Sequence, residues 1–478
     1  MAGFSFILDQ FGAYTECLKL MRCLYARLTC ILGPDDISTI RATAHLASSY
    51  RQLGRYGEAE VLEVKVLKQR IRLLGVDHPS TILASANLAV TYGRLGRYGE
   101  AEVLELEVLQ QNKRFLGVDH LNTIISATNL AQTYNELGRY DEAEVLQVEV
   151  LDKSTKLLGV DHPDTIRASA HLAATYHQLG RHREAQVLQV EVLKQRTKLL
   201  GAKHPSTIIA SAFLAQTYGE LGQYGEAELL QVEVLKQYTK SLGADHPHTI
   251  IASSNLALTY SQLGQYTRAA VLQAKVLEQR MESLGMNHPS TLQAATSLAS
   301  TYGQLDRYNE AEMLQVCVLG ASINLLGEFH PSTIQAAANL ASTYSQSGQY
   351  AQAEALEVQV LEQRTNLLGL DHPTTIRASA TLAATYSQLG RHAEAENIQS
   401  DVLRRRMTIF GDRHPDTLIA MWSLASTYKR IQRDSEALEL AKKAHSGCVE
   451  ILGEGHPHSL MVAAFLASFT TEQSVDSS

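Results

Sequence analysis

Residues 75–116 read GVDHPSTILASANLAVTYGRLGRYGEAEVLELEVLQQNKRFL and contain two helical patterns separated by a glycine turn. The first pattern opens at His78-Pro79, because proline suits the first position of a helix, and its apolar residues recur with a period near 3.6. Gly96 is expected to end this helix as a left-handed cap residue. The second pattern starts at about Tyr98, with acidic residues in its first turn and basic residues in its last, which complements the helix dipole. The stretch therefore predicts a pair of helices.

The same pattern fills nearly the whole chain of 478 residues. A Leu-Ala pair recurs in the first helix of all eleven units, from 46–47 to 466–467, and an alanine recurs in the second helix of ten units, from Ala59 to Ala437. Small residues let neighbouring helices approach closely, so we expect these positions, and the tyrosines from Tyr50 to Tyr428, to pack between helices. A compact enzyme core does not repeat one surface eleven times, so a repeat array is predicted. The glycines that set the 42-residue period are Gly33, Gly75, Gly117, Gly159, Gly201, Gly243, Gly285, Gly327, Gly369, Gly411 and Gly453.

Composition narrows the class of protein. With 45% hydrophobic and 19% charged residues, the chain buries surface and is not disordered. A net charge of −8 argues against a general binder of nucleic acid or anionic membranes. The N-terminus lacks the basic start of a signal peptide, no apolar run is long enough to span a membrane, and the five cysteines form no CxxC pair. We expect a cytoplasmic protein.

The tyrosine of the first helix, the glycine turn, the tyrosine two residues later and the alanine of the YxEAE motif resemble the tetratricopeptide repeat. The 42-residue period and the LGxxHPxT junction are similar to repeats of the kinesin light chain and nephrocystin type, which also occur in fungal and bacterial NB-ARC (STAND) receptors. The resemblance covers roughly residues 10 to 470 and implies an all-α, right-handed α-solenoid superhelix of helix pairs. The chain departs from the family where an aromatic residue of the second helix is replaced by Glu63, Glu105, Gln147, Gln189, Gln231, Gln273, Gln315 and Glu357.

The repeat frame divides the chain into three parts. Residues 1–32 read as a truncated N-terminal half-repeat, residues 33–452 as ten full units, and residues 453–478 as a C-terminal half-repeat with a polar tail. Terminal repeats normally carry a polar outer face. The helix of the C-terminal half-repeat instead carries apolar residues. We expect either a fragment of a longer protein or an array that docks at its C-terminal end.

The resemblance implies that the first helices line a concave groove in which extended peptides bind. Asparagine precedes the Leu-Ala pair in four units and can both donate to and accept from a peptide backbone. Arginine lies one turn earlier on the same face in three units, where it suits an acidic or C-terminal group of a ligand. Isolated asparagine and arginine are also common on exposed helices, and both interpretations stay open here. The candidate groove residues are Asn87, Asn129, Asn255, Asn339, Arg41, Arg167 and Arg377, with Phe213 in place of asparagine in a further unit.

Trp422 is the single tryptophan and occupies a groove position that is small in other units. With Ile419, Met461 and Phe465 it is expected to form an apolar patch near the C-terminal end of the groove, where an aromatic anchor can dominate binding energy. The alternative is that Trp422 packs under the last helix.

The histidines before the prolines suggest a metal site, but one histidine and one nearby aspartate per unit are too few ligands. We therefore expect them to act at helix starts, with no metal and no cofactor. The sequence contains none of the motifs GxxxxGK[ST], HExxH, GxSxG or GxGxxG, so we expect no enzyme activity.

The leading hypothesis is a scaffold or adaptor, similar to kinesin light chain, that binds protein or peptide ligands in the groove. The alternative is the ligand-sensing array of a STAND-type signalling protein whose NTPase domain is not in this chain. A third hypothesis is end-to-end self-association through the unclosed ends. The sequence leaves the partner's identity open.

Overall fold

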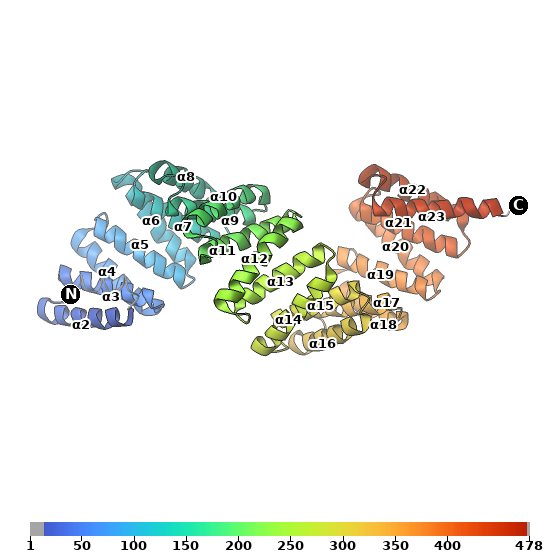
Figure 1. The fold of residues 1–478 in the computed structure, drawn as a ribbon, viewed down its shortest axis with the longest axis horizontal. Helices are drawn as coiled ribbons and strands as arrows, with labels where there is room; N and C mark the ends of the chain where they lie inside the picture. The colour runs from blue at the N-terminus through green and yellow to red at the C-terminus, as the bar shows by residue number, and fades with distance from the viewer. Residues whose placement is uncertain (1–13, 476–478) are drawn as a thin grey trace. The chain divides into compact units, whose positions relative to one another are not determined.

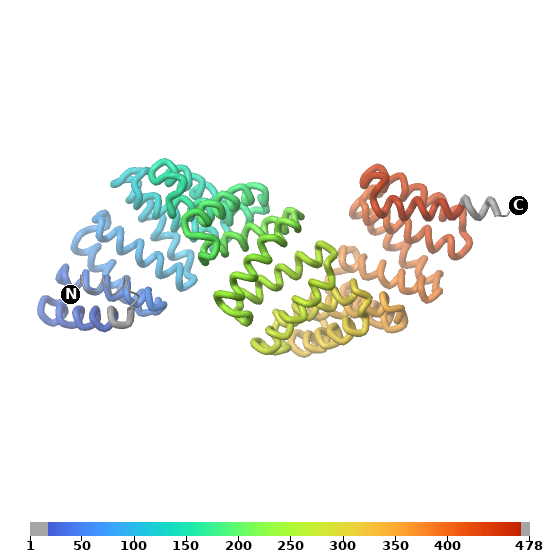
Figure 2. The backbone as a smooth tube through the Cα atoms, in the orientation of Figure 1, coloured from blue at the N-terminus to red at the C-terminus, as the bar shows by residue number. Residues whose placement is uncertain are grey.

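The computed structural model describes residues 14–475, and every regular element in that range is an α-helix (Figures 1 and 2). The chain forms two compact units: unit 1 ends at Ser241 and unit 2 begins at Leu242. In the described range a lone helix α2 (Tyr14–Leu32) precedes ten helix pairs, and α23 (Pro457–Val475) follows them. The predicted all-α solenoid of helix pairs is confirmed, whereas the division at residues 32 and 452 stays a prediction. Residues 1–13 of the expected N-terminal half-repeat lie outside the described range.

The pairs keep constant bounds along the chain. The first helices are α3 (Ile37–Gln52), α5 (Pro79–Arg94), α7 (Leu121–Glu136), α9 (Pro163–Gln178), α11 (Pro205–Glu220), α13 (Pro247–Gln262), α15 (Pro289–Gln304), α17 (Pro331–Gln346), α19 (Pro373–Gln388) and α21 (Pro415–Arg430). The second helices are α4 (Tyr56–Leu74), α6 (Tyr98–Phe115), α8 (Tyr140–Leu158), α10 (His182–Leu200), α12 (Tyr224–Leu242), α14 (Tyr266–Leu284), α16 (Tyr308–Leu326), α18 (Tyr350–Leu368), α20 (His392–Phe410) and α22 (Asp434–Leu452).

Histidine caps the first helices. In α5 the ring nitrogen Nδ1 of His78 accepts a hydrogen bond from the backbone N–H of Ser80 at 3.1 Å, while Pro79 occupies the first helical position. The first turn of a helix leaves backbone N–H groups unpaired, so this acceptor replaces a missing one. Asp36 takes the same place in α3, where its carboxylate accepts from Ser38 at 2.8 Å. The repeated histidines are thus helix caps, in agreement with the sequence interpretation.

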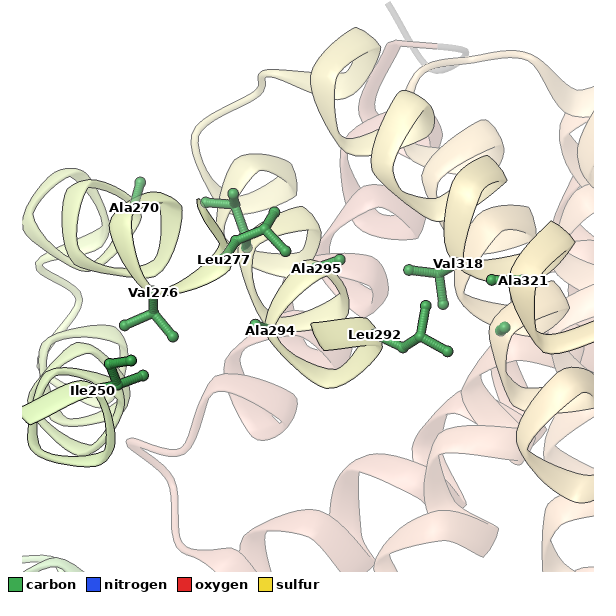
Figure 3. Close-up of a cluster of buried hydrophobic side chains, with 11 residues drawn as sticks. Ile250, Ala270, Val276, Leu277, Leu292, Ala294, Ala295, Val318 and Ala321 are labelled. Atoms are coloured by element: carbon green, nitrogen blue, oxygen red, sulfur yellow. The ribbon is translucent and has the colours of Figure 1, made fainter. Parts of the chain in front are cut away.

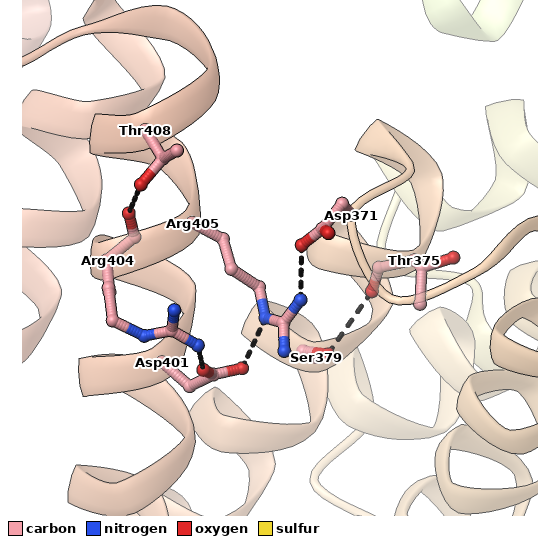
Figure 4. A network of polar contacts seen from close by, with 7 residues as sticks. All are labelled: Asp371, Thr375, Ser379, Asp401, Arg404, Arg405 and Thr408. Carbon is pink, nitrogen blue, oxygen red and sulfur yellow. Dashed lines mark hydrogen bonds and ion pairs between the residues drawn. The ribbon is translucent and has the colours of Figure 1, made fainter.

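The aspartates of the loops that lead into the first helices have structural partners. In Figure 4, Arg405 of α20 donates to Asp371, in the loop before α19, and also to Asp401 one turn earlier on α20, at 2.5 Å. In the first pair, the amide Nε2 of Gln69 donates to Asp35 at 2.8 Å. These contacts tie each leading loop to the second helix of its own pair.

Small and aliphatic side chains form the core between consecutive helices. Figure 3 shows Ile250 of α13, Val276 of α14, Leu292 of α15 and Val318 of α16 within one buried cluster. The repeated second-helix alanines from Ala59 to Ala437 are all 0% exposed, which confirms that they are packing positions.

The Leu-Ala pairs are buried in the first ten units, and the eleventh differs. In α23, Leu466 is half-buried and Ala467 is exposed. The expectation that all eleven pairs are buried is therefore wrong for this helix, because in the described part of the chain α23 packs against one second helix, α22, whereas the first helices of the ten pairs lie between two.

The repeated tyrosines pack where one pair meets the next. The guanidinium of Arg97 lies 4.4 Å from the centre of the Tyr92 ring, and its Nη1 contacts Glu60 of the preceding second helix at 2.7 Å. The same arrangement recurs at Arg139 and Arg181. In these pairs the tyrosine is thus a packing residue covered by an arginine.

Candidate functional site

A polar side chain occupies one buried position on the second helix of nine of the ten described pairs. The position lies one turn after the invariant alanine, and each of its polar side chains is less than 9% exposed. The tenth pair has alanine there, Ala441, at 0%. We call these side chains the floor residues, because they lie beneath the first helices. They are Glu63, Glu105, Gln147, Gln189, Gln231, Gln273, Gln315, Glu357 and Gln399.

The floor residues are only partly hydrogen-bonded. The hydroxyl of Thr91, on the next first helix, donates to Glu63 Oε2 at 2.5 Å, and Thr133 makes the corresponding bond to Glu105. The side-chain oxygens of all six floor glutamines are buried without a partner among the described residues. A buried acceptor without a donor costs roughly 1–3 kcal/mol. The floor glutamines therefore keep acceptor capacity that the described residues do not use.

Cavities between neighbouring first helices reach this floor. The Glu105 cavity, of about 200 Å³, lies among α5, α6 and α7. A cavity of about 400 Å³ spans α13 to α17 and contains Gln273 and Gln315. A third, of about 260 Å³, lies among α19, α20 and α21 and contains Gln399. Cavities into which a few polar groups converge are typical of binding sites.

The predicted asparagines all lie on first helices, but only two of them line these cavities. Asn129 lines the Glu105 cavity. Asn339 lines the Gln273–Gln315 cavity, and its Oδ1 accepts a hydrogen bond from Gln335 at 2.8 Å. Asn87 is half-buried on α5 and Asn255 is exposed on α13. The face is therefore not a uniform row of asparagines, and their contact with a peptide stays a prediction.

The predicted groove arginines are exposed, and second-helix arginines lie near them. Arg41 lies close enough to Arg70 of α4 to lower the pKa of that guanidinium, although burial is the larger cause. Arg377 acts in the same way on Arg364 of α18.

The third groove arginine, Arg167, belongs to a cluster with His171 and Arg196, where burial and the two positive charges lower the pKa of the histidine. It already pairs with Asp164 at 2.8 Å. Neighbouring positive charges favour an anionic ligand group, and this tendency is weakened at Arg167 by its own carboxylate partner.

Phe213 is 54% exposed on α11.

The C-terminal aromatic residues do not all meet in one cavity. Ile419 and Trp422 line the Gln399 cavity, and the indole Nε1 of Trp422 is buried without a partner among the described residues. Trp422 also packs against the cluster of α21 to α23. Met461 and Phe465 are half-buried on α23 and do not line this cavity; Phe465 contacts Phe469 edge-to-face at 5.2 Å.

The floor residues are the part of the site that the sequence did not assign. Their polar character is visible in the sequence as the replacement of an aromatic residue, unit after unit. Repetition indicated a structural role, and neither burial nor unpaired oxygens can be derived from spacing alone. The sequence feature that could have identified the floor residues is a Gln or Glu between two apolar positions that are buried, such as Gln231 between Ala227 and Val234.

The described residues contain no group of three or more His, Cys, Asp or Glu that could hold a metal ion. None of the described helices is both long enough and apolar enough to span a membrane.

Comparison with known proteins identifies the family. The tetratricopeptide repeat model matches residues 42–111, 124–198, 167–240, 290–366 and 375–448, and a second tetratricopeptide repeat model matches residues 249–290. Together these matches span well over half of the chain. The chain therefore belongs to the tetratricopeptide repeat family. This fold is typical of scaffolds for protein–protein interaction, and the family is generally non-enzymatic.

Solved structures include similar repeat proteins. A candidate kinesin light chain from Podosopora anserina, with nearly identical TPR-like repeats, is 29% identical over 43% of this chain and 98% of its own, with a TM-score of 0.40. RapI in its apo form is 12% identical over 77% and 98%, with a TM-score of 0.54. The apo quorum sensor NprR from B. thuringiensis is 15% identical over 77% and 98%, with a TM-score of 0.52. The last two share the fold. No curated protein matches the chain.

Proposed function

We propose that the protein is a scaffold or adaptor that binds extended peptide segments along the face of its first helices. The observation that carries this proposal is the set of buried, unpaired floor oxygens, together with the cavities between those helices that four floor residues line, namely Glu105, Gln273, Gln315 and Gln399. An extended peptide offers backbone N–H groups that can satisfy such acceptors. Asn129 and Asn339, at the cavity walls, supply further donors and acceptors for the main chain.

The second contribution to affinity comes from Trp422. Its indole ring lines the Gln399 cavity beside Ile419, and its unpaired N–H can donate to a ligand carbonyl. Aromatic side chains at the centre of a dry contact carry a large share of binding energy. The arginines Arg41, Arg167 and Arg377 would favour acidic residues in the same ligand.

The test selects peptides from a library of 12-residue peptides with the wild type. Binding of the selected peptides is then compared between the wild type, Asn129→Ala/Asn255→Ala and Trp422→Ala. We expect each variant to weaken binding of the selected peptides by about tenfold, as hot-spot removal does. Glu191→Ala/Lys194→Ala is the matched control, because it removes an exposed ion pair from α10 without changing net charge. Unchanged binding in both groove variants would contradict the proposal.

The sensor hypothesis assigns the same face to a ligand of a STAND-type signalling protein. A neighbouring NB-ARC segment in the parent gene would favour it, whereas an upstream heptad coiled coil would favour the adaptor. End-to-end self-association predicts a molecular size that grows with concentration in light scattering, and a constant monomer would exclude it.

A further inference from the structure

The first helix pair contains an arginine that covers its floor carboxylate. The Nε of Arg51 lies 3.3 Å from Glu63 Oε1, and the Arg51 Nη1 donates to the backbone oxygen of Asn87 at 3.3 Å. The other carboxylate oxygen accepts from Thr91 at 2.5 Å. The Arg51 side chain is only 20% exposed. This pair therefore holds a half-buried guanidinium between its floor and the next first helix.

The second helix pair repeats this site without the arginine. Moving 42 residues along the chain replaces every member of the set by a residue of the same type, except that Arg51 becomes a glycine. A Cβ atom built on that glycine meets no atom within 4 Å. The Glu105 cavity, lined by all four equivalent residues, is the space that an arginine side chain fills in the first pair. The equivalent residues are Gly93, Glu105, Asn129 and Thr133.

Glu105 lacks the cation that Glu63 has. It is 7% exposed, and its Oε2 has no hydrogen-bond partner among the described residues. Burial raises the pKa of Glu105 to about 7, and the nearby Glu102 adds to that rise, while the Thr133 hydroxyl opposes it. The rim carries one charge of each sign, Arg94 and Glu136, and both are exposed. The floor of the cavity is therefore an acid without a counter-charge.

We propose that the Glu105 cavity binds one basic side chain of a peptide ligand, with arginine preferred. The inference rests on the proposed function, because the peptide must lie along the first helices to deliver this side chain. A guanidinium can contact the carboxylate of Glu105 and donate to the backbone oxygen of Asn129, as Arg51 does at Glu63 and Asn87. A cavity of about 200 Å³ suits a single side chain.

The chain also supplies a matched control. Gly219 occupies the same position in α11 as Gly93 does in α5, and it too has no atom within 4 Å of a built Cβ. Its floor residue is the neutral Gln231. An arginine introduced at either glycine gains the same helix propensity, but only one of them meets a carboxylate.

The experiment titrates N-acetylargininamide onto the full chain by isothermal calorimetry. We expect binding by the wild type, and a loss of about tenfold or more in Glu105→Gln, which removes the charge-assisted contact. Gly93→Arg should lose binding as well, because its own side chain fills the cavity. Gly219→Arg should bind like the wild type. Circular dichroism checks that every variant is folded.

Thermal melting gives a second readout that does not need a ligand. Gly93→Arg should raise Tm more than Gly219→Arg does, and the difference should vanish when Glu105→Gln is added. A wild type that does not bind the probe, or binds it no better than Glu105→Gln does, overturns the inference.

The peptide selection separates this inference from the proposed function. Selected peptides that bind the wild type and Glu105→Gln equally would leave the scaffold function standing and remove the basic-residue site. Binding of the probe at Glu105 without selection of any peptide would remove the scaffold function and keep the cation site.

Discussion

At the scale of single residues, the choice between glutamine and glutamate on the floor decides the chemistry of each cavity. A floor glutamine is neutral at every pH, so its burial costs only an unpaired oxygen. The floor glutamates at 105 and 357 are carboxyl groups in a buried place, and burial raises the pKa of both to about 7. Burial also raises the pKa of Glu63, but the Thr91 hydroxyl and the Arg51 charge oppose that rise. The floor position thus occurs in three forms: a neutral glutamine, a buried carboxyl without a counter-charge, and a carboxyl paired with an arginine.

The pKa values of Glu105 and Glu357 predict a pH dependence of stability. Each carboxyl titrates near 4.5 when unfolded and near 7 when folded, so the folded chain holds the extra proton between those values. The contribution of this proton to the free energy of unfolding is complete below pH 4.5 and is lost as the pH rises through 7. It amounts to at most about 3 kcal/mol for each carboxyl. Glu105→Gln/Glu357→Gln should therefore match the wild type at pH 5 and unfold at higher urea concentration at pH 8.

Two other kinds of group act on these carboxyls: the Thr133 and Thr385 hydroxyls lower their pKa values, and Glu102 and Glu354 raise them. Glu107→Gln, on the exposed side of α6, is the control and should leave the pH dependence unchanged. Equal urea midpoints of wild type and double variant at pH 8 would show that the floor carboxyls are not desolvated.

At the scale of the element, the ends of the helices explain why the pairs keep constant bounds. In each of the ten pairs, a residue with positive φ lies two positions after the end of the first helix; it is glycine in most pairs, such as Gly96 at 75° after α5. Asp306 and Gln432 adopt φ of 57° and 62° at the same place. L-residues other than asparagine and aspartate seldom adopt this conformation, because Cβ approaches the following carbonyl. The hydroxyl of Tyr308 donates to Asp306 at 2.7 Å and supports it there.

Replacing Gln432 by glycine should therefore stabilise the protein. We expect Gln432→Gly to gain about 1 kcal/mol, because the left-handed strain costs more than the added freedom of the unfolded chain. Asp306→Gly should gain less, since it loses the bond from Tyr308. Differential scanning calorimetry would measure both, and a lower Tm for Gln432→Gly would contradict the prediction.

The histidine caps make a second prediction at this scale. His288 Nδ1 accepts from the backbone N–H of Ser290 at 3.1 Å at the start of α15. His288→Ala should cost about 1 kcal/mol, and His288→Asp should restore most of it, because Asp36 caps α3 in the same way. Urea denaturation of the two variants tests this; equal losses in both would show that the ring acts by packing alone.

At the scale of the whole molecule, each helix within a unit packs mainly on the helices next to it in sequence, with smaller contacts between successive first helices. The stability of such arrays is close to a sum of terms for repeats and their interfaces. Stability therefore grows with repeat number.

Removal of one complete repeat should preserve the fold of the remainder. Deleting residues 286–327 joins Gly285 to Glu328, which restores the junction of a normal unit. We expect unchanged mean residue ellipticity and a Tm only a few degrees lower. Deleting residues 307–327, which removes α16 alone, should reduce helicity and Tm much more, because two first helices then meet without the second helix between them. Similar melting of both deletions would contradict the nearest-neighbour picture.

The sequence by itself determined the period, the helix pairs, the caps and the packing positions, because each depends on local geometry that recurs every 42 residues. Ala59 and Gly96 could be assigned in this way from spacing alone. Only the tertiary structure decided which repeated residues line cavities and form the candidate site. Glu105 and Glu63 occupy the same position of the repeat. Only Glu63 is paired with a cation, because Arg51 fills a space that Gly93 leaves open. Burial and pairing depend on what three neighbouring helices place together, and one helix does not contain that information.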